Sequence, residues 1–281
     1  MKIAFWSIDN EKCNVTANLA AISVASVSRY PFSVVTIENH LNRSNLGMAY
    51  QGFVKSVLFN EVGTNYYDGG GIEGFLRKIY RGDVNSQNFN AYFREVIQKR
   101  LYYIPQSRII HSDLFDYEFS HCLQTMLGII EKKSDICFID TASNNNLSTK
   151  TILDTSDLIV VNLCQDLKIL DTFFSNYSSL IPKSIFIISD YNMHSNLRYK
   201  KIAEVYQISQ DDIIPIPSNL GYQLAYNDGS VVAFIRNYYN CPNESPNYTF
   251  IRSIRKAALI IIRKAIMLAK EKDNHLETTI N

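Results

Sequence analysis

The chain has 281 residues and a formal net charge of +1, and 46% of its residues are hydrophobic. That composition supports a sizeable core and disfavours a disordered chain, while the balanced charge argues against the broad basic face of a nucleic-acid-binding protein. Glycine is scarce, at 11 residues, and the first one is Gly47. A glycine-rich phosphate-binding loop near the N-terminus is therefore excluded.

Short apolar runs rich in β-branched residues alternate with helical patterns along the chain. The predicted strands cover residues 3–6, 34–37, 101–105, 135–140, 157–163, 184–189 and 213–216. The clearest predicted helices cover 15–27, 75–80 and 119–130. This alternation is typical of an α/β fold with a doubly wound, mostly parallel sheet of about seven strands flanked by helices. We assign residues 1–270 to a single domain, with an insertion-like region at about 47–107 and a polar C-terminal tail at 271–281, which we expect to be frayed from residue 274 onward.

Cysteine usage and hydropathy predict the compartment. The five cysteines lie far apart, and no two form a C-x-x-C pair, so neither a disulfide framework nor a zinc knuckle is indicated. The first apolar run is much shorter than a signal-peptide core, and no run of 18 uncharged apolar residues follows it. We therefore expect a cytoplasmic protein.

The loop and helix after the first predicted strand match the spacing of a known motif. Residues 7–20, SIDNEKCNVTANLA, align without gaps with the K-G-G-x-G-K-T-T-T-x-x-N-L-A segment of the MinD/ParA group of P-loop proteins. Residues 35–41 fall where that group has its D-x-D-P switch, and residues 138–142 fall on its I-I-D-T-P segment. Residues 185–192 and 214–217 look like the segments that flank its base pocket. The chain thus resembles the MinD/ParA group, most closely the CpaE-like proteins that accompany Tad-type pilus or secretion machines.

This resemblance implies a site for ATP and Mg²⁺. Lys12 takes the place of the invariant phosphate-binding lysine, and Cys13 replaces the threonine that holds magnesium. Glu38 keeps the first acidic position of the switch, and His40 replaces its water-positioning aspartate. Asp140 is the one intact acid and would hold a metal only if Mg-ATP binds. The nucleotide-binding set implied in this way, if it is retained, is Asp9, Asn10, Glu11, Lys12, Cys13, Asn14, Glu38, Asp140 and Asp190.

Elementary chemistry argues against ordinary magnesium-dependent ATP hydrolysis at this loop. A phosphate loop needs positive φ angles that glycine adopts without strain, but Ile8, Asp9 and Glu11 replace its glycines. Both carboxylates would face polyphosphate, and like charges about 4 Å apart repel by about 4 kcal/mol at an effective dielectric constant near 20. The thiol of Cys13 is a soft ligand and suits magnesium poorly. We therefore expect a degenerate Walker A motif and a pseudo-ATPase with no catalytic residues.

Simpler interpretations of the same residues stay open. Lys12 can be a solvated loop lysine paired with Asp9 or Glu11. Asp140 can bond the amides of the loop that follows its strand. His40 is expected to be a surface or hydrogen-bonded histidine rather than a base.

Two further constellations carry weaker signals. Gly69–Gly71 can cradle an anion before a helix or form a flexible turn. Cys13 and His40 lie at strand ends on one predicted sheet edge, but a nucleophile pair there lacks a third, orienting residue. The five histidines show no metal-binding spacing, so no further metal site is expected.

The segment from residue 250 to residue 270 contains six cations and no acid. Its apolar residues fill at least half of a helical wheel, which favours a last helix packed on the sheet with its basic side in water. The alternative is a basic amphipathic helix on an anionic membrane, such as the tail that the resemblance to MinD implies. The residues that would contact a membrane or a partner are Arg252, Arg255, Lys256, Arg263 and Lys264.

Three functions follow from this sequence. The favoured one is a degenerate MinD/ParA/CpaE-like protein that does not hydrolyse nucleotide, or binds it weakly. It would act as a scaffold or regulator of a pilus or secretion assembly, through a homodimer or a protein partner. The second is an active ATP-binding switch ATPase of the same family, and the third is a membrane-surface adaptor at the inner face of the membrane. No specific nucleic acid is expected as a partner.

Overall fold

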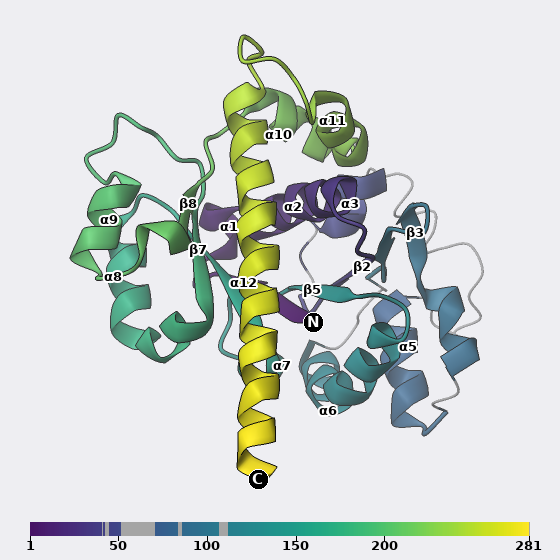
Figure 1. Cartoon of the computed structure of the whole chain (residues 1–281). Coiled ribbons are helices and arrows are strands. Elements are labelled where there is room, and N and C mark those ends of the chain that lie inside the picture. Colours follow the sequence, from purple (N-terminus) through teal and green to yellow (C-terminus); the bar gives the residue numbers. More distant parts are fainter. Residues whose placement is uncertain (41, 43–44, 52–70, 84–85, 107–111, 281) are drawn as a thin grey trace.

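The computed structural model describes residues 1–40, 42, 45–51, 71–83, 86–106 and 112–280. An eight-stranded sheet with the order β3-β4-β2-β5-β1-β6-β7-β8 forms its centre (Figure 1). Neighbouring strands are parallel except for β3 and β4. The strands are β1 (Lys2–Trp6), β2 (Val34–Glu38), β3 (Arg94–Ile97), β4 (Leu101–Tyr103), β5 (Ile136–Asp140), β6 (Leu158–Leu163), β7 (Ser184–Ile188) and β8 (Ile213–Pro215).

The sheet confirms the predicted mostly parallel α/β architecture and corrects its strand number. All seven predicted strands are present, with ends within two residues of the prediction. The eighth, β3, pairs antiparallel with β4 through a tight connection in which Lys99 has a φ of 56°. Its four residues are exposed or half-buried, so β3 lacks the apolar run that marks the other strands.

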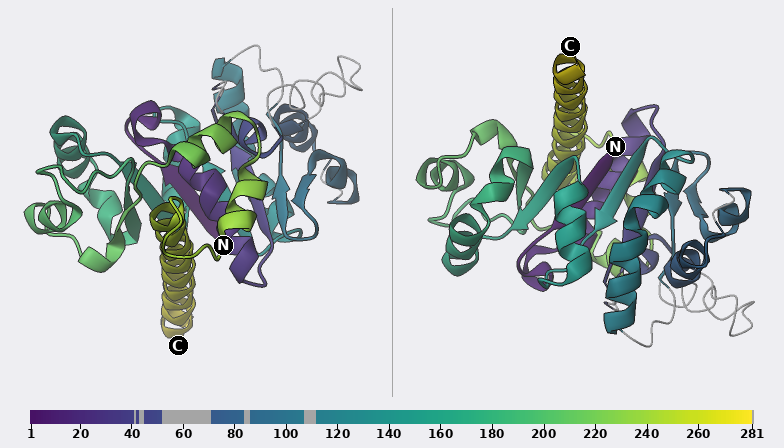
Figure 2. Two further views of the ribbon diagram at one scale, coloured as in Figure 1. Left: turned by 90° about the horizontal axis from the view of Figure 1, so that it is seen from above. Right: turned by 90° about the horizontal axis from the view of Figure 1, so that it is seen from below.

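Helices cover both faces of the sheet (Figure 2). Alternation along β1 shows the two layers, because Ile3 and Phe5 pack on one face and Ala4 and Trp6 on the other. The first face is covered by α2 (Val15–Arg29), α3 (Leu46–Gln51), α10 (Leu220–Asn227), α11 (Val231–Tyr238) and α12 (Tyr248–Ile280). The second is covered by α5 (Gly71–Tyr80), α6 (Ser112–Glu131), α7 (Leu147–Thr155), α8 (Leu167–Asn176) and α9 (Tyr199–Val205).

The last helix, α12, packs against α2 and against the strands β6 and β8. Its C-terminal end extends past the rest of the molecule (Figures 1 and 2). The helix continues to Ile280, so residues 274–280, expected to be frayed, are helical here. Among the described residues, no helix is both long enough and apolar enough to cross a bilayer.

Candidate functional site

The carboxyl ends of the parallel strands meet at one edge of the sheet and bring most of the predicted site residues together. Glu38 ends β2 and Asp140 ends β5, and the two are register partners in the ladder. The short helix α1 (Asn10–Cys13) follows β1 at the same edge. Ligands of open α/β sheets bind at this edge.

The loop between β1 and α2 is folded as a capped helical turn. Asp9 is the N-cap of α1, and its Oδ1 accepts a hydrogen bond from Lys12 N at 3.1 Å. Cys13 N donates to Asp9 O at 3.1 Å, and Asp9 N donates to Ser7 Oγ at 3.1 Å. These backbone amides are therefore engaged within the loop, and a carboxylate occupies the place where an anion would be bound.

The Lys12 side chain lies mostly in solvent at this edge of the sheet. Its Nζ lies 3.7 Å from Asp9 Oδ2, and its side chain is 60% exposed. This is the arrangement of a solvated loop lysine paired with Asp9, one of the two interpretations left open by the sequence. A surface pair of this kind contributes little to stability.

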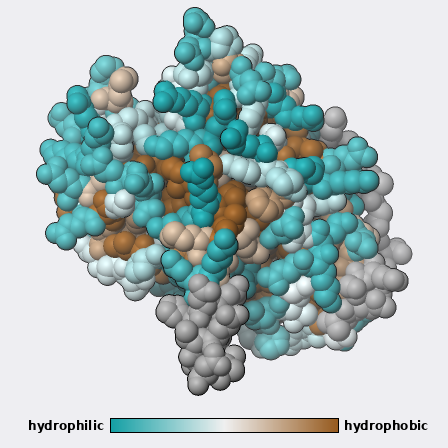
Figure 3. All heavy atoms as spheres, viewed as in Figure 1, coloured by the Kyte–Doolittle hydropathy of each residue, from teal (hydrophilic) through white to brown (hydrophobic). Residues whose placement is uncertain are grey.

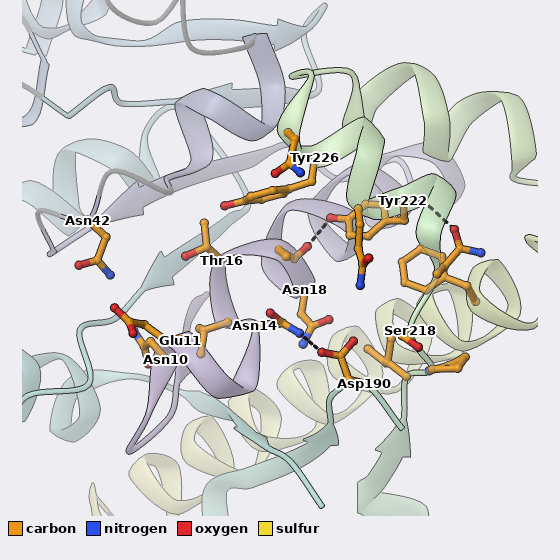
Figure 4. Close-up of a pocket in the computed structure, with 18 residues that line it drawn as sticks. Asn10, Glu11, Asn14, Thr16, Asn18, Asn42, Asp190, Ser218, Tyr222 and Tyr226 are labelled. Carbon is orange, nitrogen blue, oxygen red and sulfur yellow. Dashed lines mark hydrogen bonds between the residues drawn. The ribbon is translucent and has the colours of Figure 1, made fainter. Parts of the chain in front are cut away.

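Beside the loop lies a pocket of about 720 Å³ (Figure 4). It is formed by the start of α2, by Asp190 after β7, by residues 216–218 after β8 and by α10. Asn14 Nδ2 donates to Asp190 Oδ2 at 2.5 Å, and Tyr222 donates its hydroxyl hydrogen to Ala17 O. Among the described lining residues, two are acids, Glu11 and Asp190, and none is a lysine, arginine or histidine. The volume suits a small organic ligand, but the charge does not favour polyphosphate.

Next to the loop, Glu38, His40 and Asp140 form a buried cluster. His40 Nε2 lies 3.0 Å from Asp140 Oδ2 and 3.9 Å from Glu38 Oε1. All three side chains are almost fully buried. Glu38 also accepts hydrogen bonds from Leu46 N at 2.7 Å and from the Tyr103 hydroxyl at 3.2 Å. Neither oxygen of Asp140 has an aligned hydrogen bond among the described residues, so His40, rather than loop amides, faces this carboxylate.

The protonation of His40 follows from competing effects. Burial lowers the pKa of His40, but the charges of Asp140 and Glu38 outweigh burial and raise it to about 9. Two donors, Asn42 N and Gln106 Nε2, oppose a proton on Nδ1, each at 3.4 Å. A hydrogen bond contributes about 1 kcal/mol, whereas full charges 3–4 Å apart interact by about 4–5 kcal/mol at an effective dielectric constant of 20. The charges prevail, and His40 is an imidazolium at neutral pH.

Burial also raises the pKa of Glu38 to about 7, and the charge of Asp140 acts in the same direction. The His40 cation and the hydrogen bonds from Leu46 and Tyr103 pull this pKa down. At neutral pH Glu38 is therefore near its midpoint, while His40 balances the second carboxylate.

The same three residues offer donor atoms to a metal ion. Their donor atoms lie within 4.8 Å of one another, which would give a cation three ligands. Magnesium prefers an octahedron of oxygen ligands, whereas one of these donors is an imidazole nitrogen. Once protonated, that nitrogen has no lone pair to donate. The residues do not fit magnesium, and the imidazolium itself supplies a cation to the buried carboxylates.

Comparison with known proteins finds likeness in structure only. No family model matches this sequence, and no curated protein matches it. Among solved structures, the ParA family ATPase from Chlorobium tepidum TLS has a TM-score of 0.66 at 15% identity, over 92% of this chain and 98% of that one. The cell division ATPase MinD of Pyrococcus furiosus has a TM-score of 0.66 at 15% identity, over 93% and 98%. The chain has the MinD/ParA fold. The MinC:MinD cell division protein complex of Aquifex aeolicus also matches, with a TM-score of 0.64 at 12% identity, over 93% of this chain and 95% of that one.

In this MinD/ParA fold, the described site divides into two groups of predicted residues. Asn10, Glu11, Asn14 and Asp190 line the pocket, whereas Glu38 and Asp140 belong to the buried cluster. Lys12 points to Asp9, as described above. Gly69 and Gly70 lie outside the described residues.

Sequence reasoning missed the contribution of α10 to the pocket. Asn219 caps this helix by accepting from Tyr222 N at 2.7 Å, which directs Tyr222 toward α2. Tyr226, one turn later, also lines the pocket. The sequence did offer one indication of this. α10 begins soon after the segment 214–217, which the resemblance placed beside the base pocket.

The predicted basic helix is a core element with a partly engaged basic side. Ile254, Ala257 and Ile261 are fully buried against the sheet and α2, so the packed-helix interpretation is confirmed. Arg255 Nη1 donates to Tyr239 O at 3.1 Å, and Lys264 Nζ lies 3.0 Å from Asp212 Oδ2. The other three predicted contact residues, Arg252, Lys256 and Arg263, are exposed. Hydrophilic side chains accordingly run along α12 in the space-filling view (Figure 3).

Proposed function

We propose that this protein works by contact with other protein chains, and not by hydrolysing ATP. It would serve as a scaffold or regulator of a pilus or secretion assembly, through a homodimer or a protein partner. The MinD/ParA fold supports the general class, and the CpaE-like spacing in the sequence supports the assembly. The observation that carries the proposal is the capped turn after β1, in which Asp9 accepts hydrogen bonds from the backbone amides of Lys12 and Cys13.

The turn would have to unfold before it could bind a triphosphate. Opening it breaks the bonds from Lys12 N and Cys13 N to Asp9 and loses the N-cap, which is worth about 1 kcal/mol. The phosphates would then meet the carboxylates of Asp9 and Glu11 with one exposed lysine to offset them. The loss of the capped turn and the repulsion between carboxylates and phosphates therefore both weaken the binding of nucleotide.

The buried cluster supports the same conclusion from the neighbouring strands. In a nucleotide-dependent switch, bound metal and phosphate hold the switch segments in place. Here His40 joins the ends of β2 and β5 by its contacts with Glu38 and Asp140. A cation that belongs to the chain makes the arrangement independent of a ligand.

An active ATP switch is the second candidate, and the pocket is the observation that favours it. About 720 Å³ remain open between α2 and α10, beside Asp190, Ile216 and Pro217. A pocket of this size accepts a nucleoside. In this alternative the turn rearranges and Lys12 leaves Asp9 to reach the phosphates.

Equilibrium binding of labelled ATP with Mg²⁺ separates the two candidates. We expect no saturable binding at millimolar nucleotide. The variants are Lys12→Ala and, as a control, Lys168→Ala, which changes an exposed lysine on α8. Tight binding that Lys12→Ala abolishes and Lys168→Ala preserves would overturn the proposal in favour of the switch.

The membrane-adaptor alternative has a separate test. Because Ile254, Ala257 and Ile261 are buried, α12 would have to leave the sheet to insert its apolar side. We expect the full chain not to co-sediment with anionic liposomes at physiological salt. Co-sedimentation that a triple Arg252→Gln, Lys256→Gln and Arg263→Gln variant loses would support the adaptor.

A further inference from the structure

Cys13 and Cys164 approach each other at the edge of the sheet. Cys13 ends α1, and Cys164 directly follows β6. Because β1 and β6 are parallel neighbours, with Trp6 opposite Val161, the segments that leave them emerge side by side. α1 packs against β6, and Cys13 and Cys164 belong to the same apolar cluster, Cys13 as a buried member and Cys164 packed against it. Residues 151 positions apart thus lie together at this edge of the sheet.

The two thiols have different surroundings. Cys13 is fully buried, whereas Cys164 is partly exposed. The neighbouring Cys13 thiol lowers the pKa of Cys164, an effect that Lys12 reinforces and that burial, Asp166 and Asp9 oppose. The same contact and burial raise the pKa of Cys13. Cys164 is therefore the nucleophilic, accessible sulfur, and Cys13 is the protected thiol beside it.

The remaining cysteines lack this arrangement. Cys122 is buried, and its thiol donates to Leu76 O at 3.7 Å. Cys137 is buried in β5, and burial raises the pKa of its thiol to about 12. Cys241 is a free cysteine and is partly exposed, like Cys164. It provides a matched control.

We propose that Cys13 and Cys164 form a reversible disulfide and make this edge of the sheet a site of oxidative modification. With hydrogen peroxide as the oxidant, the Cys164 thiolate attacks one peroxide oxygen, the O–O bond breaks, and hydroxide leaves and takes up a proton as water. The product is a sulfenic acid on Cys164. The Cys13 sulfur then attacks the Cys164 sulfur, the S–S bond forms, and a second water leaves with the Cys13 proton. Two thiols and one peroxide give one disulfide and two waters, and a dithiol reductant reverses the change.

The disulfide would fasten the capped turn to the end of β6. Cys13 lies in the same turn as Asp9 and Lys12, so oxidation would hold the β1–α2 loop in its present, closed form. A covalent link between distant positions also restricts the unfolded chain. Oxidation should therefore raise the thermal midpoint of the full chain, and a reductant should return it to its starting value.

The test is peptide mapping of the full chain after treatment with stoichiometric hydrogen peroxide, without reductant. We expect one cross-linked peptide pair joining Cys13 and Cys164, in the wild type and in Cys241→Ser alike. Cys164→Ser should lose the cross-link. Cys13→Ser should accumulate a Cys164 sulfenic acid that dimedone labels, while Cys241 stays unlabelled.

Two results would overturn the proposal. One is a wild-type protein whose oxidised cysteines do not include the Cys13–Cys164 pair. The other is labelling of Cys164 no faster than that of Cys241, which is also partly exposed. If Cys13→Ser does not fold, as circular dichroism would show, the wild-type map and the rate comparison decide the matter alone.

Discussion

Replacing His40 with glutamine should destabilise the protein strongly, because it leaves Glu38 and Asp140 buried without a cation. The separations of His40 Nε2 from the carboxylates, 3.0 and 3.9 Å, correspond to about 5 and about 4 kcal/mol of attraction at an effective dielectric constant of 20. The cost of burying the charges offsets part of this. Removing one partner of a buried ion pair typically costs about 3–5 kcal/mol, out of a total stability of about 5–15 kcal/mol.

Urea unfolding at pH 7 measures this loss. The control is His194→Gln, which changes an exposed histidine and should leave the free energy of unfolding unchanged within about 0.5 kcal/mol. A double variant, His40→Gln with Asp140→Asn, should recover part of the loss because it also removes one unpaired carboxylate. A loss below about 1 kcal/mol, in the range of a surface pair, would refute the reasoning.

The pH dependence of stability tests the same cluster. The pKa of His40 is 6.5 in model compounds and about 9 in the fold, so its stabilisation is complete below pH 6.5 and is lost as pH rises through 9. The difference corresponds to roughly 3 kcal/mol. Burial raises the pKa of Glu38 from 4.5 to about 7, so Glu38 also favours the fold at low pH and this effect fades between those values. Wild-type stability should therefore fall between pH 7 and pH 10 more steeply than that of His40→Gln. If the stability of the wild type and that of His40→Gln fall in parallel over this pH range, His40 is not protonated in the fold.

Two further predictions concern packing and backbone geometry. Ile261→Ala should cost about 2–5 kcal/mol in urea unfolding, because Ile261 is fully buried between α12 and the sheet, whereas Met267→Ala, at a side chain 46% exposed, should cost less than about 1 kcal/mol. Equal losses would mean that α12 is not part of the core. Gly71→Ala should lower the thermal midpoint, because Gly71 has a φ of 76° and a Cβ there would lie 2.4 Å from Pro105 O. Gly128→Ala, within α6 where a Cβ meets nothing within 4 Å, should instead raise stability by about 0.5–1 kcal/mol. Identical midpoints for these two variants would contradict this account of the Gly71 turn.

Most of the fold follows from hydropathy, because the seven predicted strands are mostly apolar and mostly buried. β3 escaped prediction since Arg94–Ile97 is a short edge strand whose pairing depends on the tight turn at Lys99. The fraying expected from residue 274 onward was wrong for a related reason. The polar composition of this segment predicts fraying, whereas α12 continues to Ile280 as an extension of a helix anchored in the core.

The nearness of several candidate residues was predictable, but their contacts were not. The ends of β2 and β5 place Glu38 and Asp140 side by side, which strand order alone implies. His40 was expected to be at the surface or hydrogen-bonded; it is buried instead, with its Nε2 3.0 Å from Asp140 Oδ2. Its ion pairs with two carboxylates could not be read from the sequence, because they depend on how the chain turns after β2 and on burial there. The partner of Cys13 was missed likewise, since Cys164 lies 151 residues away and no short motif connects them.

The most direct test of the central claim is calorimetric titration of the full chain with ATP in the presence of Mg²⁺. The capped turn after β1 and the acidic pocket predict no saturable heat up to millimolar nucleotide. Replacing Asp9 and Glu11 together with glycine, which removes the cap and both loop carboxylates, should strengthen any residual binding of nucleotide. Saturable binding in the micromolar range by the wild type, lost in Lys12→Ala, would contradict the account and identify the protein as a nucleotide-dependent switch.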